Sequence, residues 1–130
     1  MPKYCRGPIA RHPAIRFALS VTGRIADRSS EEAAYHIVQE SISNAVRHGE
    51  PKQIRITVMA EKDVLQVCIE DDGGGLRPNA QAHMSLGHMG LIGMEERVRS
   101  LNGRFTVEEG AGGGVVIRAL LPNVREAELA

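Results

Sequence analysis

The sequence contains no tryptophan and only two phenylalanines and two tyrosines, so its core must be built from aliphatic side chains. This scarcity of aromatic residues argues against a nucleic-acid surface on which bases stack. Sixteen lysines and arginines balance sixteen aspartates and glutamates, and a net charge of zero gives no electrostatic footprint for DNA or an anionic membrane. We therefore expect neither nucleic acid nor a membrane surface as a direct partner.

Cysteine is also scarce, since Cys5 and Cys68 are the only two and lie far apart. Two such residues cannot by themselves build a disulfide framework or a zinc site. No apolar run approaches the length of a membrane-spanning helix, and no secretory signal opens the chain. We expect a reducing, cytoplasmic environment, which is compatible with a membrane protein whose membrane part lies elsewhere.

The length and composition that remain favour one folded domain. The 130 residues are 42% apolar, which is enough for a hydrophobic core. Residues 1–13 contain three prolines without periodicity and are predicted to be a flexible arm or linker. The domain is expected over residues 14–122, and residues 123–130 read as a polar tail.

The first half of the domain predicts a strand, a helix and a hairpin. Residues 14–23 alternate and end on glycine, which favours a strand. The helix signal that follows is the strongest in the chain, with Ser29 and Glu32 in the spacing of a capping box and Gly49 at its end. Residues 53–71 hold two β-rich runs separated by a turn, which predicts an antiparallel hairpin.

The second half predicts a helix and two more strands. Leu91, Met94, Val98 and Leu101 form one stripe of a helix, and Glu95 can pair with Arg99. Residues 104–110 and 113–122 are expected to be strands joined by a glycine-rich turn. The order β-α-β-β-α-β-β predicts an α+β fold: a two-layer sandwich with a mixed, mostly antiparallel sheet and the helices on one face.

The first helix carries an unusual polar face. At 100° per residue, four polar side chains fall within about a third of the circumference: Glu40, Asn44, Arg47 and His48. The opposite side would hold Tyr35, Val38, Ser41, Ile42, Ala45 and Val46. Ala33 and Ile37 share the polar arc, where a purine could use them. The oxygens of Glu40 and Asn44, one turn apart, suit Mg²⁺, while Arg47 and His48 could meet phosphate oxygens.

The stretch "IEDDGGGL", residues 69–76, places two carboxylates before three glycines. A calcium loop would need alternating acidic ligands and a distal glutamate, which are lacking here. Neither a Rossmann G-x-G-x-x-G that opens a helix nor a P-loop motif is present. A turn cap and a ligand-reading carboxylate both remain open for Asp71 at this level.

Four motifs together resemble the ATP-binding domain of sensor histidine kinases, in particular the subgroup that includes the nitrate sensors. "HIVQESISNAVRHG" is similar to the N box, "IEDDGGGL" to the G1 box, and "GHMGLIGMEERVRSLNG" to the G2 box, while "GAGGGVVIRALLP" resembles the last glycine turn and closing strand. The resemblance covers about residues 15–122. It implies the Bergerat ATP-binding fold of the GHKL superfamily, which agrees with the order of elements.

The resemblance implies a role for each matching residue. Asp71 would accept a hydrogen bond from the exocyclic amino group of adenine, and Asp72 would bond locally within its turn. Gly73 and Gly75 would let backbone lie against the purine. Further nucleotide contacts are implied for Gly87, Gly90, Leu91 and Gly93, where free helix amides favour phosphate. Residues 76–89 would form a lid, and Gly112, Gly113 and Gly114 a tight turn.

The implied reaction uses ATP and Mg²⁺, held by Asn44 and Glu40. The γ-phosphoryl group would pass to a histidine on a dimerisation domain, and from there to a response regulator. No histidine of this chain fits the acceptor pattern, so we expect a catalytic module with Glu40 as metal organiser or base. Two alternatives stay open: a serine/threonine kinase of the anti-sigma type, and a non-catalytic nucleotide-binding module on the same fold.

Overall fold

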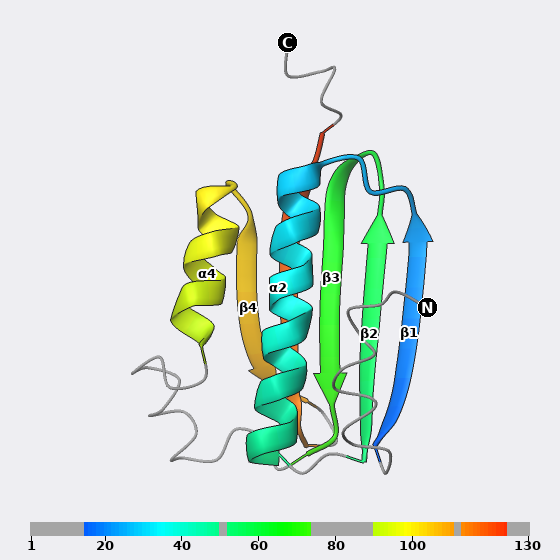
Figure 1. Ribbon diagram of the computed structural model, residues 1–130, viewed down its shortest axis with the longest axis vertical. Coiled ribbons are helices and arrows are strands. Elements are labelled where there is room, and N and C mark those ends of the chain that lie inside the picture. The colour runs from blue at the N-terminus through cyan, green and yellow to red at the C-terminus, as the bar shows by residue number, and fades with distance from the viewer. Residues whose placement is uncertain (1–14, 50–51, 74–89, 111–112, 125–130) are drawn as a thin grey trace.

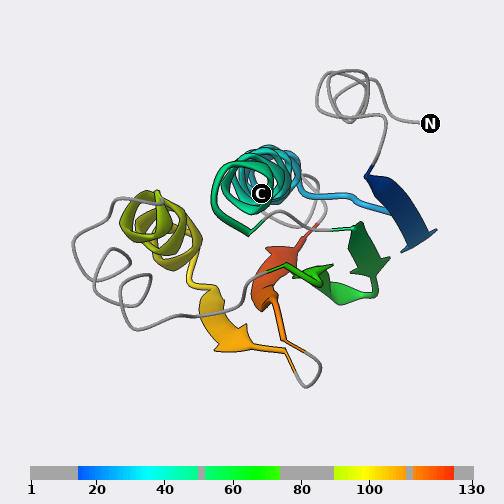
Figure 2. The same cartoon turned by 90° about the horizontal axis from the view of Figure 1, so that it is seen from below.

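The computed structural model describes residues 15–49, 52–73, 90–110 and 113–124. They form two layers, with one five-stranded sheet and both helices packed on the same face of it (Figures 1 and 2). The elements, in chain order, are β1 Arg16–Gly23, α2 Arg28–Asn44, a π-helical turn Ala45–Gly49, β2 Gln53–Ala60, β3 Asp63–Asp71, α4 Leu91–Ser100, β4 Arg104–Glu109 and β5 Val115–Asn123.

The strand order is β1-β2-β3-β5-β4. β1 runs parallel to β2, and every other neighbouring pair is antiparallel. The predicted mixed, mostly antiparallel sheet with helices on one face is therefore confirmed. β3 lies in the middle of the sheet, so that its last residue, Asp71, is paired with Ile54 of β2 on one side and Val115 of β5 on the other.

The core is aliphatic, as the scarcity of aromatic residues requires. β2, β3 and β5 bury alternate side chains under the helices, including Ile56, Leu65, Val67 and Leu121. The stripe predicted for the second helix is confirmed, since Leu91, Met94 and Val98 are buried and Leu101 packs against the same cluster. The predicted ion pair joins Glu95 Oε1 and Arg99 Nη2 at 3.6 Å.

The orientation predicted for the first helix is wrong in part. Ala33 and Ile37, expected beside a purine, are 1% and 0% exposed and belong to the core. Tyr35, expected in the core, is half-buried, and its ring lies 5.8 Å from that of His36. Ser41 and Ile42 are buried as predicted, and the apolar side chains of Ala33 and Ile37 join them because burial removes their surface from water. The buried face is therefore rotated toward the predicted polar arc.

The start of α2 also differs from the capping box predicted at Ser29. The N-cap is Asp27, whose Oδ1 accepts a hydrogen bond from the Ser30 amide at 3.1 Å. Its Oδ2 accepts a second one from Val124 at 3.4 Å. Serine and aspartate are both good N-cap residues, and the additional bond to the end of β5 favours the helix start at Asp27.

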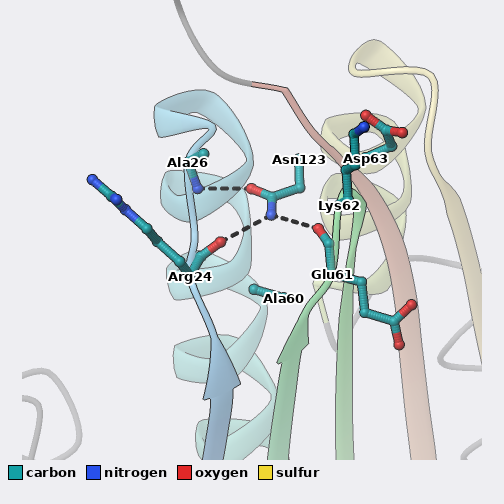
Figure 3. A pocket seen from close by; sticks show the side chains of 7 residues that line it. All are labelled: Arg24, Ala26, Ala60, Glu61, Lys62, Asp63 and Asn123. Carbon is teal, nitrogen blue, oxygen red and sulfur yellow. Dashed lines mark hydrogen bonds between the residues drawn. The ribbon is translucent and has the colours of Figure 1, made fainter.

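Asn123 connects three segments at this end of the molecule, the end of β5, residues 24–27 and the turn at Glu61, although the sequence places it in the polar tail. It is 7% exposed and is the last residue of β5. Its Oδ1 accepts from the amides of Ala26 and Asp27 at 2.7 and 3.3 Å. Its Nδ2 donates to the carbonyls of Arg24 and Glu61 at 3.0 and 2.8 Å. All of its hydrogen-bonding capacity is therefore used within the protein (Figure 3).

This asparagine lines a surface pocket of about 460 Å³. Its lining, drawn in Figure 3, consists of Arg24, Ala26, Ala60, Glu61, Lys62, Asp63 and Asn123. The pocket lies at the end of the sheet opposite Asp71, since β2 ends and β3 begins there. In the part of the chain that the structure describes, neither helix combines the length and apolar character needed to cross a membrane.

Candidate functional site

Residues of three predicted motifs lie toward one end of the sandwich. In Figure 1 the last turns of α2 and the end of β3 lie at the lower end, and α4 begins in the lower half of the view. They carry Asn44, Asp71 and Gly90, which are separated by up to 46 positions in the sequence (44 to 90). The strand register explains part of this arrangement, because β3 runs antiparallel to β2, and β2 follows the end of α2.

Asp71 is a half-buried carboxylate at the end of the central strand. Its Oδ1 accepts a hydrogen bond from the amide of Gly73 at 2.9 Å. Burial raises the pKa of Asp71, and the amides of Gly73 and Val115 counteract this effect only in part. A carboxylate that is held by backbone amides in a partly desolvated place can read a hydrogen-bond donor. The turn-capping bond to Gly73 is therefore compatible with the predicted ligand-reading role of Asp71.

Asp72 behaves differently from its neighbour. Its side chain is exposed, and its Oδ1 accepts hydrogen bonds from the amides of Lys52 and Gln53 at 2.8 and 2.9 Å. The amide of Gln53 is the main cause of a lowered pKa for Asp72. The sequence predicted bonding within the local turn, but the partners lie at the start of β2, 19 and 20 positions away. This pairing joins two strands and could not be derived from local sequence.

Gly113 and Gly114 form the predicted tight turn, with φ angles of 96° and 79°. The Gly113 amide donates to the carbonyl of Gly110, and the Gly110 amide donates to that of Gly114. A Cβ atom on Gly114 would clash with the backbone oxygen of Asp71. Glycine is thus required here for its left-handed backbone and for the close approach of β5 to the end of β3.

Glu40 belongs to the motif that resembles the N box, and it lies close to Gly90 of the motif that resembles the G2 box. Its Oε2 lies 2.8 Å from the position that a Cβ would take on Gly90, the N-cap of α4. Gly90 has φ 70° and provides no side-chain cap, and its carbonyl accepts the Met94 amide at 3.1 Å. Because Gly90 has no side chain to cap the helix, the first backbone amides of α4 can donate to another acceptor. Ser41 supports the same junction, since its Oγ lies 3.9 Å from Sδ of Met94.

Asn44 and Arg47 follow Glu40 along the same segment. Asn44 is the last α-helical residue of α2 and is 5% exposed. The π-helical turn then changes the angular step, so the regular wheel does not extend to Arg47. Arg47 is exposed, and its Nη2 donates to Oγ of Ser43 at 3.0 Å. Its predicted approach to phosphate would require this bond to break.

The remaining predicted site residues differ in what the structure describes. Leu91 is 7% exposed and packs in the core, and Gly93 is exposed on the first turn of α4 with open space around it. Gly73 supplies the amide that Asp71 accepts. Gly75, Gly87, Gly112, the side chain of His48 and the proposed lid, residues 76–89, lie outside the described residues.

The family model for histidine kinase-, DNA gyrase B- and HSP90-like ATPases matches residues 29–125. The sensor histidine kinase YdfH of Bacillus subtilis (strain 168) is 33% identical over 100 residues, which are 76% of this chain and 24% of YdfH. The nitrate/nitrite sensor protein NarX of Escherichia coli (strain K12) is 30% identical over 87 residues, covering 65% of this chain and 14% of NarX.

The fold agrees with a solved structure. The crystal structure of the ATP binding domain of PrrB from Mycobacterium tuberculosis has a TM-score of 0.71 and 19% identity, with 94% of this chain and 90% of that chain covered. Our chain spans about a quarter or less of the length of the curated relatives above. The resemblance to histidine kinases, nitrate sensors included, is confirmed. The chain belongs to the family of histidine kinase-, DNA gyrase B- and HSP90-like ATPases.

Proposed function

We propose that this domain binds ATP with Mg²⁺ and supplies the γ-phosphoryl group to a histidine on a separate dimerisation domain, in two-component signal transduction. The observation that carries the proposal is that Glu40 of α2 lies against Gly90 of α4, with the end of β3 that bears Asp71 at the same end of the sheet as the last turns of α2. The family match and the sensor histidine kinases among the relatives support it. A response regulator is the expected downstream partner, and the cytoplasm is the expected location.

Asp71 is proposed to select adenine. A carboxylate fixed by backbone amides can accept a hydrogen bond from the exocyclic amino group, and a purine without that group would leave it unpaired. The direction of the pKa shift, upward through burial, agrees with this role, because carboxylates with perturbed pKa values gather at functional sites. Gly73, and by family resemblance Gly75, would leave room for the base against bare backbone.

The residues of α2 and α4 are proposed to hold the phosphates. The amide oxygen of Asn44 and the carboxylate of Glu40 fit Mg²⁺, a hard cation that takes few protein ligands and completes its shell with phosphate and water. Bound Mg²⁺ would neutralise phosphate charge during transfer. The amides behind Gly90 and Gly93, and Gly87 by resemblance, would bind phosphate oxygens with Arg47 and His48. Leu91 would support that end from the core.

The direct test is calorimetric binding of ATP to the wild type, Asn44→Ala and Asp71→Asn, each with and without Mg²⁺. Asn44→Ala should remove the metal-dependent part of the affinity. Asp71→Asn should weaken binding with or without the metal, because it changes the group that reads the base. Equal affinities for all three proteins would contradict the proposed site.

A second test concerns the reaction. Glu40 is proposed to organise Mg²⁺ or to polarise the acceptor imidazole, so the isolated chain should hydrolyse ATP only slowly. A histidine-bearing dimerisation domain added in trans should receive phosphate on histidine. Rapid hydrolysis by the chain alone, lost in Glu40→Ala, would instead assign Glu40 as the base for water, and phosphorylation of serine would favour the anti-sigma type of kinase.

A further inference from the structure

The position of Asp71 depends on residues that have no assigned role. Asp71 is the last residue of β3, so the strand pairing that holds the backbone in place stops at this residue. Its own hydrogen bond to Gly73 is local and would move together with the strand end. What fixes the strand end must therefore come from the neighbouring strands, β2 on one side and β5 on the other.

On the β2 side, Asp72 makes three contacts with one dipeptide. Its Oδ1 accepts both the Lys52 and Gln53 amides, and its own amide donates to the Gln53 carbonyl at 3.3 Å. Lys52 and Gln53 lie where the chain enters β2 after the π-helical turn that carries Arg47. Asp72 thus links the end of the Asp71 strand to the segment that leads from Asn44 and Arg47.

On the β5 side, Gly114 lets the backbone of β5 reach that of β3. A side chain at this position would clash with the Asp71 carbonyl oxygen, and φ of 79° makes any substitution strained. The next residue, Val115, is paired with Asp71 in the sheet. The close approach of the β5 backbone to the end of β3 therefore depends on the missing side chain of Gly114.

We propose that Asp72 and Gly114 are positioning residues that form a two-sided clamp on Asp71 and so determine the preference for adenine over a 6-oxopurine. Neither is assigned a contact with the nucleotide. The inference rests on the proposed function, because it assumes that Asp71 reads the amino group of the base. A role limited to fold stability would lower the affinities for all nucleotides together and leave the preference unchanged.

The experiment is the ratio of the affinities for ADP and inosine diphosphate, measured by calorimetry with Mg²⁺ on the 130-residue chain. Asp72→Ala removes the acceptor for both β2 amides and, because Asp72 is exposed, leaves no cavity. The ratio should fall about tenfold, since a misplacement of about 1 Å can cost on the order of a hundredfold. Asp72→Asn retains an acceptor oxygen and should keep the ratio within about twofold of wild type.

The matched control is Glu70→Ala. It removes a carboxylate from the adjacent position of β3, where Glu70 forms a 3.9 Å ion pair with Arg55 on the helix-free face. Its ratio should equal that of the wild type. Amide hydrogen exchange at Lys52 and Gln53 gives a second readout, and it should become faster in Asp72→Ala and remain slow in Asp72→Asn.

Gly114→Ala tests the other side of the clamp and should lower the ratio by about a hundredfold if the variant folds. An unchanged ratio in Asp72→Ala would overturn the proposal while leaving ATP binding intact. An equal loss of ratio in Asp72→Asn and Asp72→Ala would also overturn it. If the wild type binds neither nucleotide, the proposed function and the clamp both fall.

Discussion

The two ends of the sheet use their polar side chains in opposite ways. At one end, the amide group of Asn123 is buried and pairs with four backbone groups of its own chain. At the other end, Asp71 remains a carboxylate whose pKa is raised by burial. Glu40 nearby makes no hydrogen bond or ion pair with any residue that the structure describes, although it lies against Gly90.

We interpret the Asn123 end as a structural connection, called the joint below, and the Asp71 end as the proposed binding site. A buried polar group that is fully satisfied within the chain stabilises one arrangement and has nothing left to offer a ligand. A partly buried carboxylate without full compensation lowers the stability of the folded state at neutral pH. Such carboxylates are found mainly at functional sites. A surface pocket alone is therefore weak evidence for binding, since one of about 460 Å³ is lined by Asn123, whose side chain is already satisfied within the chain.

The largest expected effect is that of Asn123→Ala, which tests whether the Asn123 end serves stability alone. It would leave two amides and two carbonyls without their partners in a partly buried place, and should lower the free energy of unfolding by about 2–4 kcal/mol. Urea unfolding followed by circular dichroism measures this in a chain without tryptophan. The ADP preference of the folded fraction should not change, because Asn123 lies at the opposite end.

Arg118→Ala on the same strand provides the control for this loss. Arg118 is exposed and its Nη1 lies 3.2 Å from Oε1 of Glu108, so its removal should cost no more than about 0.5 kcal/mol. If Asn123→Ala costs no more than this control, or if it abolishes nucleotide preference in the folded protein, the distinction between joint and site fails.

How far the sequence predicts this arrangement depends on the range of the interactions involved. Apolar periodicity, β-rich runs and the capping and turn residues located the two helices and five strands of the residues that the structure describes, because these signals act over a few residues. The resemblance to the family motifs brought Glu40, Asn44 and Asp71 into one hypothesis. Asn123, by contrast, looked like a polar tail, because its partners are up to 99 positions away in sequence. Such long-range pairing leaves no local pattern.

Two further differences concern the first helix. Asp27 and Ser29 are both suitable N-caps, and Asp27 has additional long-range hydrogen bonds, to Asn123 and to Val124 just after β5. The π-helical turn at 45–49 changes the phase of the helix after Asn44, so a wheel drawn with a constant step misplaces Arg47. The prediction of local turn bonding for Asp72 was wrong because its partners, Lys52 and Gln53, are distant in the sequence, as are those of Asn123.

The next prediction tests the choice of N-cap within the Asn123 end. Asp27→Ala should destabilise the protein by about 1 kcal/mol, because the Ser30 amide loses its acceptor. Ser29→Ala should be nearly neutral, since Ser29 is exposed on the first turn and α2 is capped without it. Thermal unfolding of the pair decides the matter, and a larger loss for Ser29→Ala would restore the capping box.

The smallest expected effects are on the pH dependence of stability, and they sharpen the contrast between Asp71 and Asp72. A raised folded pKa means that the stability contributed by Asp71 is present below its unfolded pKa, about 3.9, and is lost as the pH rises through the folded value. Asp71→Asn should therefore be more stable than the wild type at pH 7, and this gain should disappear near pH 4.

Asp72 has a lowered pKa, so its contribution has the opposite sign. It is present above the unfolded value of about 3.9 and is lost as the pH falls through the folded one. Asp72→Asn should accordingly be slightly less stable than the wild type at pH 7. Urea unfolding of both variants between pH 4 and 8 measures the two trends. If Asp71→Asn is no more stable than the wild type at pH 7, burial does not govern Asp71, and the electrostatic support for its proposed role as the adenine-reading carboxylate is lost.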